Sequence, residues 1–144
     1  ILDDSRITKA AKVERVLFCT GKISLDLFDA LDKEEYKNKS ETTAIVRIEQ
    51  LHPFHIEKAV GILSRYKNAK VIAWVQEEPA NMGAYLHLRF DLSLLISKIF
   101  SGKELCYFGR SRRATPAVGL EKLHFIEQEK ILHAALVSNY SVEI

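Results

Sequence analysis

Residues 71–85 read VIAWVQEEPANMGAY, and this stretch decides the fold. Its first five residues form an unbroken apolar run, which is typical of a strand buried on both faces. Two carboxylates, Glu77 and Glu78, then end the run, and a proline and a glycine turn the chain into a helix. Ligands and neighbouring domains meet an open α/β sheet at the carboxyl ends of its strands, so we expect contacts at this turn.

Three further apolar runs predict strands of the same sheet. They are Val16–Cys19, Ala44–Ile48 and Leu105–Phe108. Apolar residues at helical spacing predict helices over residues 23–31, from Ile56 to Asn68, from Tyr85 to Gly102 and from about Leu120 to Val137. Strands that alternate with helices favour a mainly parallel sheet with helices on both faces, which is a three-layer α/β/α fold.

Length and charge limit the classes of partner. A chain of 144 residues is expected to form one domain. Its 21 basic and 19 acidic residues are too balanced for a protein that neutralises phosphates along a duplex, so we expect no nucleic acid partner. The longest apolar stretch, Leu92–Phe100, is interrupted by two serines and a lysine and is shorter than the roughly 18 residues of a membrane helix. We therefore expect no membrane partner.

Cysteines and the first residues bear on the cellular setting. Cys19 and Cys106 both lie in predicted strands, which indicates buried reduced thiols rather than a disulfide. The chain begins with Ile1, and its only methionine is Met82. Because the first residues lack the basic flank and apolar stretch of a signal peptide, we expect the sequence to be part of a longer chain.

No self-contained catalytic or metal site is predicted. Glu77 and Glu78 are adjacent on an extended segment, so their side chains point to opposite sides and cannot flank one bond. We interpret them as structural or interdomain residues. His52 and His55 are separated by a proline that prevents helical alignment, and no third ligand is near in sequence. Glycine-rich phosphate motifs and activated nucleophiles are also missing.

The best polar candidate is a basic group after the first and fourth strands. Arg110, Arg112 and Arg113 follow the fourth strand, and Thr20 and Lys22 follow the first. Guanidinium groups beside a helix N-terminus suit a phosphate or a carboxylate. Two alternatives remain open, namely a solvated basic loop and salt bridges to the acidic turn at residues 77–78.

Four blocks of the sequence carry a resemblance to a known family. They are VLFCTGK at 16–22, AIVRIEQLHPF at 44–54, WVQEEPANMG at 74–83 and YFGR…TPAVG at 107–119. In this order they resemble the C-terminal domain of the decarboxylating first component of 2-oxoglutarate dehydrogenase. The resemblance covers most of the chain from about Val13 to Leu136.

The resemblance implies a transketolase C-terminal-like domain over residues 14–144, entered by a connector over residues 1–13 that comes from upstream domains. Its sheet would have about five strands, one of them an antiparallel edge strand that the pattern does not locate. The parent enzyme is a homodimer that uses thiamine diphosphate and magnesium to decarboxylate 2-oxoglutarate. It passes the succinyl unit to the lipoyl group of the dihydrolipoyl succinyltransferase component. Since the cofactor lies in the upstream domains, we expect this segment to hold no cofactor and no catalytic residue.

The resemblance also implies roles for particular residues. Some family members bind acetyl-CoA or a nucleotide such as AMP at this domain, and the family's recurrent arginine after the fourth strand matches Arg110. The candidates for an effector phosphate are Arg110, Lys22, Thr20, Arg112 and Arg113. The candidates for interdomain or dimer contacts are Glu77, Glu78, Asn81 and His52.

Three other interpretations of the sequence remain open. The first is the same domain in a related 2-oxoadipate dehydrogenase or 2-oxoglutarate decarboxylase, since these branches share much of it. The second is a free-standing module that binds a phosphate ligand, and the third is a small enzyme of flavodoxin-like shape. The family resemblance would place the protein in the cytoplasm of a bacterium or the mitochondrial matrix of a eukaryote.

Overall fold

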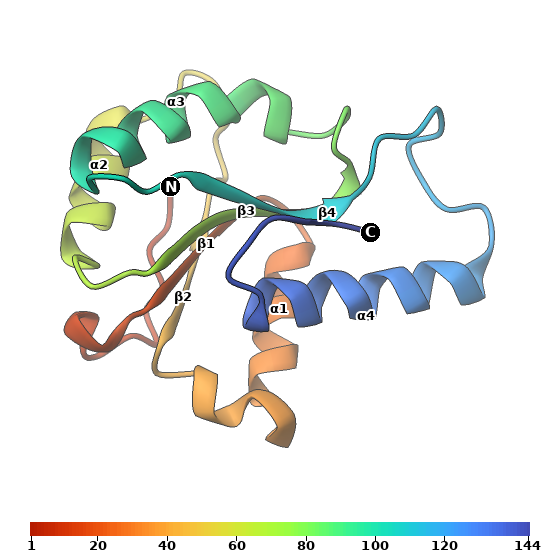
Figure 1. Ribbon diagram of the computed structural model, residues 1–144, viewed down its shortest axis with the longest axis horizontal. Coiled ribbons are helices and arrows are strands. Elements are labelled where there is room, and N and C mark those ends of the chain that lie inside the picture. Colours follow the sequence, from red (N-terminus) through yellow and green to blue (C-terminus); the bar gives the residue numbers. More distant parts are fainter.

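The computed structural model describes residues 1–144 as a five-stranded sheet between two pairs of helices (Figure 1). The strands are β1 (Arg15–Cys19), β2 (Thr43–Arg47), β3 (Val71–Pro79), β4 (Leu105–Arg110) and β5 (Val142–Glu143). The helices are α1 (Ile23–Asp32), α2 (Ile56–Arg65), α3 (Tyr85–Ile99) and α4 (Glu121–Val137), with short 3-10 helices η1 (Ala10–Lys12) and η2 (Glu34–Lys39). This confirms the predicted three-layer α/β/α fold. None of these helices combines the length and apolar character needed to cross a bilayer.

The sheet is parallel throughout, in the order β2-β1-β3-β4-β5. The expected antiparallel edge strand is therefore wrong. The fifth strand runs parallel to β4 and pairs Val142 with Phe108 and Glu143 with Gly109. The physical reason is the connection, because α4 carries the chain back along the sheet before β5 begins, and a strand after such a crossover runs in the same direction as the one before it.

Strand β3 is longer than the apolar run predicts. The run was expected to end before Glu77, but the strand continues to Pro79, with an irregularity in its pairing with β4 between Val75 and Pro79. Beyond this irregularity Pro79 pairs with Arg110, and the N–H of Ala80 donates to the Arg110 carbonyl at 2.9 Å. The acidic turn is thus held against the end of β4.

Alternation of side chains along the strands divides the buried residues into two cores. Phe18 and Trp74 belong to the core on the face covered by α2 and α3, whereas Leu17 and Phe108 belong to the core on the face covered by α1 and α4. Figure 1 shows these two pairs of helices on opposite sides of the sheet. The first core contains 23 buried apolar residues and the second contains 16. The core on the α1–α4 face is therefore the smaller of the two.

The first residues lie along the edge of β2. Leu2 exchanges two backbone hydrogen bonds with Arg47, at 2.7 and 2.9 Å, in an isolated antiparallel bridge. The carboxylate of Asp4 accepts a hydrogen bond from the N–H of Ile45 at 3.0 Å. These contacts occupy backbone groups of an edge strand that would otherwise be open to pairing with another chain. The segment predicted as a connector therefore packs on the sheet.

A buried arginine fixes the end of α4. The guanidinium of Arg15, in β1, donates to the carbonyls of Ala135 at 3.1 Å and Ser138 at 2.7 Å, and to the side chain of Asn139 at 3.2 Å. A cation at a helix C-terminus satisfies free carbonyls and interacts favourably with the helix dipole. Arg15 thereby sets the position of α4, which carries one half of the site described next.

Candidate functional site

The carboxyl ends of β1, β3 and β4 bring several predicted site residues to one edge of the sheet. Gly21, with φ +71°, turns the chain after β1 so that Lys22 begins the approach to α1. The Lys22 ammonium lies 3.1 Å from a carboxylate oxygen of Glu77 and 2.5 Å from one of Asp26. The guanidinium of Arg110 donates to the main-chain carbonyl of Glu77. Glu77 therefore connects the two parts of the basic group predicted from the sequence.

Arg110 lies inside the protein and faces a buried carboxylate. Its residue is 3% exposed, and Glu127 of α4 is 5% exposed. The Nε of Arg110 is 2.7 Å from Oε2 of Glu127. A second guanidinium nitrogen lies 3.3 Å from Nδ1 of His124, one turn earlier on α4. Arg110, which the structure places as the last residue of β4, thus ties the end of this strand to α4.

Arg113 completes a three-residue cluster around the same carboxylate. It contacts both oxygens of Glu127, at 2.9 and 2.7 Å. Its backbone is held by Asn81, whose side chain accepts from the Arg113 N–H at 3.0 Å and donates to the Arg113 carbonyl at 2.9 Å. The predicted contact residue Asn81 therefore fastens the basic loop to the turn after β3. We call Arg110, Arg113 and Glu127 the Glu127 cluster.

Three of the basic residues at this edge, Lys22, Arg110 and Arg113, are each paired with a carboxylate. Hydrogen bonds from Arg113, and next from Arg110, hold the pKa of Glu127 below its usual range against the effect of burial. Burial disfavours the charge of Lys22, but Asp26 and Glu77 outweigh it and raise the pKa of Lys22. A phosphate that approached Arg110 or Arg113 would have to compete with Glu127, so only the more exposed cations are readily available to a ligand.

The remaining predicted residues lie outside the Glu127 cluster. Arg112 and Glu78 are exposed, and Thr20 is half-buried at the end of β1. His52 is also exposed, and its ring faces that of His87 on α3 with 5.9 Å between the ring centres. The structure thus brings Lys22, Glu77 and Arg110 together. Glu78, Arg112 and His52 are exposed to solvent.

Gln76 organises the turn between β3 and α3, and the sequence did not single it out. Its side-chain oxygen accepts from the indole N–H of Trp74 at 2.9 Å and from the backbone N–H of Tyr85 at 3.1 Å. Its amide nitrogen lies within 3.1 Å of the carbonyls of Glu78, Pro79 and Met82. One buried side chain therefore closes the loop that presents Asn81 to Arg113.

Signals for the missed residues exist in the sequence. Gln76 is a polar residue that directly continues a fully apolar strand, and buried polar groups are almost always hydrogen-bonded. Glu127 precedes Ile131, Ala134 and Ala135 by four, seven and eight residues, which places it on the buried face of α4. An acidic residue on such a face requires a partner, and a basic loop is the natural source.

The two cysteines and the possible metal ligands bear on whether nucleophilic or metal chemistry could occur here. Both cysteines are free, but only Cys19 is buried, while Cys106 is half-buried, so the prediction of burial is right for one of them. Burial raises the pKa of Cys19 to about 12, which keeps it a thiol. No group of three or more His, Cys, Asp or Glu side chains is arranged to hold a metal ion.

Comparison with known proteins gives a consistent result. The family model described as 2-oxoglutarate dehydrogenase C-terminal matches residues 1–136. The chain is 44% identical over 130 residues to the 2-oxoglutarate dehydrogenase E1 component of Geobacillus kaustophilus, which is 90% of this chain and 13% of the relative. It is 41% identical over 125 residues to the E1 component of an Exiguobacterium species, which is 87% of this chain and 13% of the relative.

A third relative shows the same coverage. The E1 component of Bacillus cereus is 40% identical over 135 residues, which is 93% of this chain and 14% of that protein. The chain thus spans a small fraction of the length of the curated relatives that it matches, while nearly all of its own residues are included in the match.

Proposed function

This chain belongs to the 2-oxoglutarate dehydrogenase C-terminal family, and from this premise we propose that it is the C-terminal domain of a 2-oxoglutarate dehydrogenase E1 component. In this proposal the whole enzyme uses thiamine diphosphate and magnesium to decarboxylate 2-oxoglutarate and transfers the succinyl unit to a lipoyl group. The domain itself carries no reacting residue. Its role is assembly with the rest of the enzyme.

The proposed partners follow from that role. Residues 14–144 form the domain, and residues 1–13 are the connector from upstream domains of the same chain. The other partners are the homodimer mate and the dihydrolipoyl succinyltransferase component. The relatives with 44%, 41% and 40% identity are all named 2-oxoglutarate dehydrogenase E1 component, which supports 2-oxoglutarate over the related oxo acids.

One observation carries the proposal of a non-catalytic role. At the carboxyl edge of the sheet, where an α/β protein usually holds its ligand, three basic side chains are paired with carboxylates of the same domain. Arg110 and Arg113 share Glu127, and Lys22 lies between Asp26 and Glu77. Groups paired in this way hold β1, β3, β4 and α4 together, which is a structural role.

The test compares the 144-residue chain with the full-length enzyme. Calorimetry with thiamine diphosphate and magnesium, and carbon dioxide release from 2-oxoglutarate, are expected to give signals for the full-length enzyme and none for the 144-residue chain. A cooperative thermal transition of the short chain serves as the control that it is folded. Cofactor binding or decarboxylation by the folded short chain would contradict the non-catalytic role.

We also propose that a phosphate-bearing effector, acetyl-CoA or AMP, contacts this edge. Two cations favour it, because Arg112 is exposed and the Lys22 side chain, although paired with Asp26 and Glu77, is still 58% exposed beside the start of α1. Thr20 follows β1 directly and precedes Lys22 by two residues. Arg110 and Arg113 would act indirectly, because they hold Glu77 and the basic loop in place.

Replacing Lys22 or Arg112 by alanine is expected to weaken effector binding about tenfold or more, since a hydrogen bond to a charged group contributes roughly 1.5–3 kcal/mol. Isothermal calorimetry on the full-length enzyme with acetyl-CoA and with AMP measures this. The matched control is Lys58→Ala, an exposed lysine on α2. The effector proposal fails if neither compound binds, or if Lys22→Ala and Arg112→Ala behave like the control.

A further inference from the structure

A polar cavity of about 250 Å³ lies at the amino ends of β1, β2 and β3, at the opposite edge of the sheet from the Glu127 cluster. The first residues of these strands are neighbours in the sheet, since Arg15 pairs with Thr43 on one side and with Val71 on the other. Polar residues from several segments line the cavity, and they include Glu14, Arg15, Lys39, Thr43, Lys70 and Asn139. We call it the amino-edge cavity.

The hydroxyl of Thr43 has no hydrogen-bond partner in the protein, although this residue is only 1% exposed. Buried hydroxyl groups are nearly always hydrogen-bonded, because an unpaired one loses its contact with water without compensation. One other buried side-chain atom, Oε1 of Gln128, also lacks a partner, but Gln128 is anchored through its amide nitrogen to Asp26 at 2.8 Å. The Thr43 hydroxyl is therefore free to bond a molecule held in the amino-edge cavity.

Positive charge exceeds negative charge around this cavity. Its lining contains three cations, Arg15, Lys39 and Lys70, and one carboxylate, Glu14. Lys70 lies 2.7 Å from Glu14, whereas neither Arg15 nor the half-buried Lys39 takes part in an ion pair of the chain. Arg15 is 8% exposed and contacts only carbonyl and amide oxygens, which carry no net charge. Because buried cations usually have a counter-charge, the cavity favours an anion.

The pKa of Glu14 reports the same excess of positive charge. The hydrogen bond and the charge of Lys70 lower this pKa most, and the charges of Lys39 and Arg15 lower it further. The three cations therefore act together on a carboxylate at the cavity, as they would on the oxygen atoms of a bound anion.

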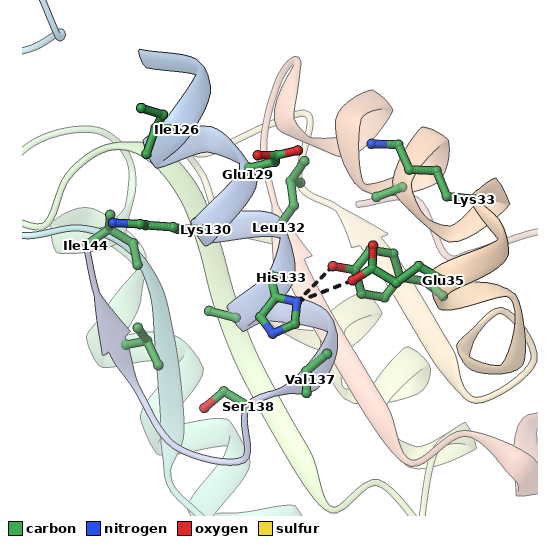
Figure 2. A pocket seen from close by; sticks show the side chains of 14 residues that line it. Lys33, Glu35, Ile126, Glu129, Lys130, Leu132, His133, Val137, Ser138 and Ile144 are labelled. Carbon is green, nitrogen blue, oxygen red and sulfur yellow. Dashed lines mark hydrogen bonds and ion pairs between the residues drawn. The ribbon is translucent and has the colours of Figure 1, made fainter. Parts of the chain in front are cut away.

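The larger groove of about 600 Å³ between α4 and the α1–η2 segment differs in charge and in pairing (Figure 2). Its central histidine, His133, has a partner, because Nδ1 lies 2.9 Å from the hydroxyl of Tyr36. Two lysines and two glutamates line this groove, namely Lys33, Lys130, Glu35 and Glu129. Its charges are thus balanced, and only the amino-edge cavity combines an excess of cations with a buried unpaired hydroxyl.

We infer that the amino-edge cavity is a binding site for a phosphate group, held by the hydroxyl of Thr43 and the ammonium groups of Lys39 and Lys70. Arg15 adds positive charge from the wall of the cavity while it keeps its contacts to the end of α4. Glu14 competes with the phosphate for Lys70 and thereby weakens binding.

The size of the cavity and the placement of its donors favour phosphate. A volume of about 250 Å³ is below the roughly 300–1,000 Å³ of pockets for drug-sized ligands, so the cavity admits a phosphate group but not a whole nucleotide. The donors come from η2, from β2 and from the segment before β3, and they therefore approach a ligand from several directions. A tetrahedral phosphate offers oxygens in several directions, whereas a carboxylate offers two in one plane. Since the proposed effector contact lies at the opposite edge of the sheet, occupancy of this cavity does not depend on the proposed function.

Protection of lysines from reductive methylation in the full-length protein tests this site. The probes are inorganic phosphate and methyl phosphate, with acetate for comparison, each titrated at constant ionic strength while labelling is followed by mass spectrometry. We expect a phosphate probe to slow the labelling of Lys39 and Lys70 and to leave the exposed Lys58 of α2 unchanged. Protection by inorganic phosphate alone would identify the free ion as the ligand, and protection by methyl phosphate would identify a phosphate group carried on a larger molecule.

Two substitutions are expected to shift the phosphate concentration that half-protects Lys39 in opposite directions. Thr43→Val keeps the shape of the side chain and is expected to raise this concentration about tenfold or more, the usual effect of losing one hydrogen bond to a charged group. Glu14→Gln removes the competing carboxylate and is expected to lower it. The matched control is Thr115→Val, an exposed threonine after β4, which is expected to leave it unchanged.

Four results would overturn the assignment: no protection of Lys39 by either phosphate probe, equal protection of Lys58, equal protection by acetate, or a Thr43→Val protein that behaves like Thr115→Val. Glu14→Gln keeps the test decisive if Thr43→Val folds poorly, because a folding defect cannot tighten binding. A Glu14→Gln protein that binds phosphate no more tightly than the wild-type protein would also contradict the site.

Discussion

Replacement of Glu127 by alanine is expected to lower the free energy of unfolding by about 3–5 kcal/mol, the usual cost of removing one partner of a buried ion pair. The Arg110 guanidinium would then remain 3% exposed without a counter-charge. Arg113, which contacts both oxygens of Glu127, would lose its main contact as well. Urea unfolding followed by fluorescence of the single tryptophan measures the change.

The matched control is Glu129→Ala, which removes an exposed carboxylate from the same helix and is expected to change stability by about 0.5 kcal/mol or less. Equal effects of the two substitutions would show that the Glu127 cluster does not stabilise the fold. Such a result would also remove the explanation for why the arginine at the end of β4 is buried.

Acid provides an independent check of the same carboxylate. Because the pKa of Glu127 is lowered in the folded protein, its charge adds stability above its ordinary value of 4.5, and this stability is lost as the pH falls through the lower folded pKa. The stability difference between the wild-type protein and Glu127→Gln is therefore expected to shrink as the pH is lowered from 7 to below 4. A difference that stays constant over this range would contradict the assigned role of the charge.

The layer arrangement could be predicted because the first four strands are each visible in the sequence as a run of apolar residues. Four apolar runs alternate with helical spacing, and parallel strands joined by helices have few other ways to pack. The short strand β5 could not be predicted in the same way. It has only two residues, so it has no period of its own, and its direction is set by the crossover through α4.

The candidate site was predictable in its location but only in part in its chemistry. The carboxyl ends of parallel strands meet at one edge, which is why Lys22, Glu77 and Arg110 could be expected near one another. Their partners depend on the rotation of α4 about its axis, which brings Glu127 to Arg110 across 17 residues of chain. The burial of Arg110 also results from tertiary packing. The sequence of the basic loop therefore does not reveal that this arginine is buried.

The last helix illustrates a second limit. Helical spacing predicts that Leu123, Ile131, Ala135 and Leu136 lie on the inner face of α4, but Leu123 is 41% exposed whereas the other three are buried. Apolar residues of α4 such as Phe125 and Val137 also occupy exposed positions, so spacing alone does not define one inner face.

Replacement of Gln76 by leucine is expected to destabilise the protein by about 3 kcal/mol or more, although the two side chains have similar size. Leucine removes the only side-chain acceptor for the Trp74 indole N–H and the Tyr85 N–H, and each buried donor left unpaired costs roughly 1–3 kcal/mol. It also removes the donor shared by three carbonyls of the turn. Urea unfolding measures the loss, and the fluorescence of Trp74 reports the altered surroundings directly.

The effect of this substitution should extend from the turn to the basic loop. Gly83, with φ +67°, packs so closely on Gln76 that an added Cβ would lie 3.0 Å from its side-chain oxygen, so the turn has little room to rearrange. When the turn loosens, Asn81 loses its fixed position and with it the two hydrogen bonds to Arg113.

The control is Gln50→Leu, in which an exposed glutamine loses a hydrogen bond to the Pro53 carbonyl, with an expected change of about 0.5 kcal/mol or less. If Gln76→Leu is no more destabilising than this control, then backbone pairing between β3 and β4 alone holds the turn, and the link from Gln76 through Asn81 to the Glu127 cluster has no energetic basis.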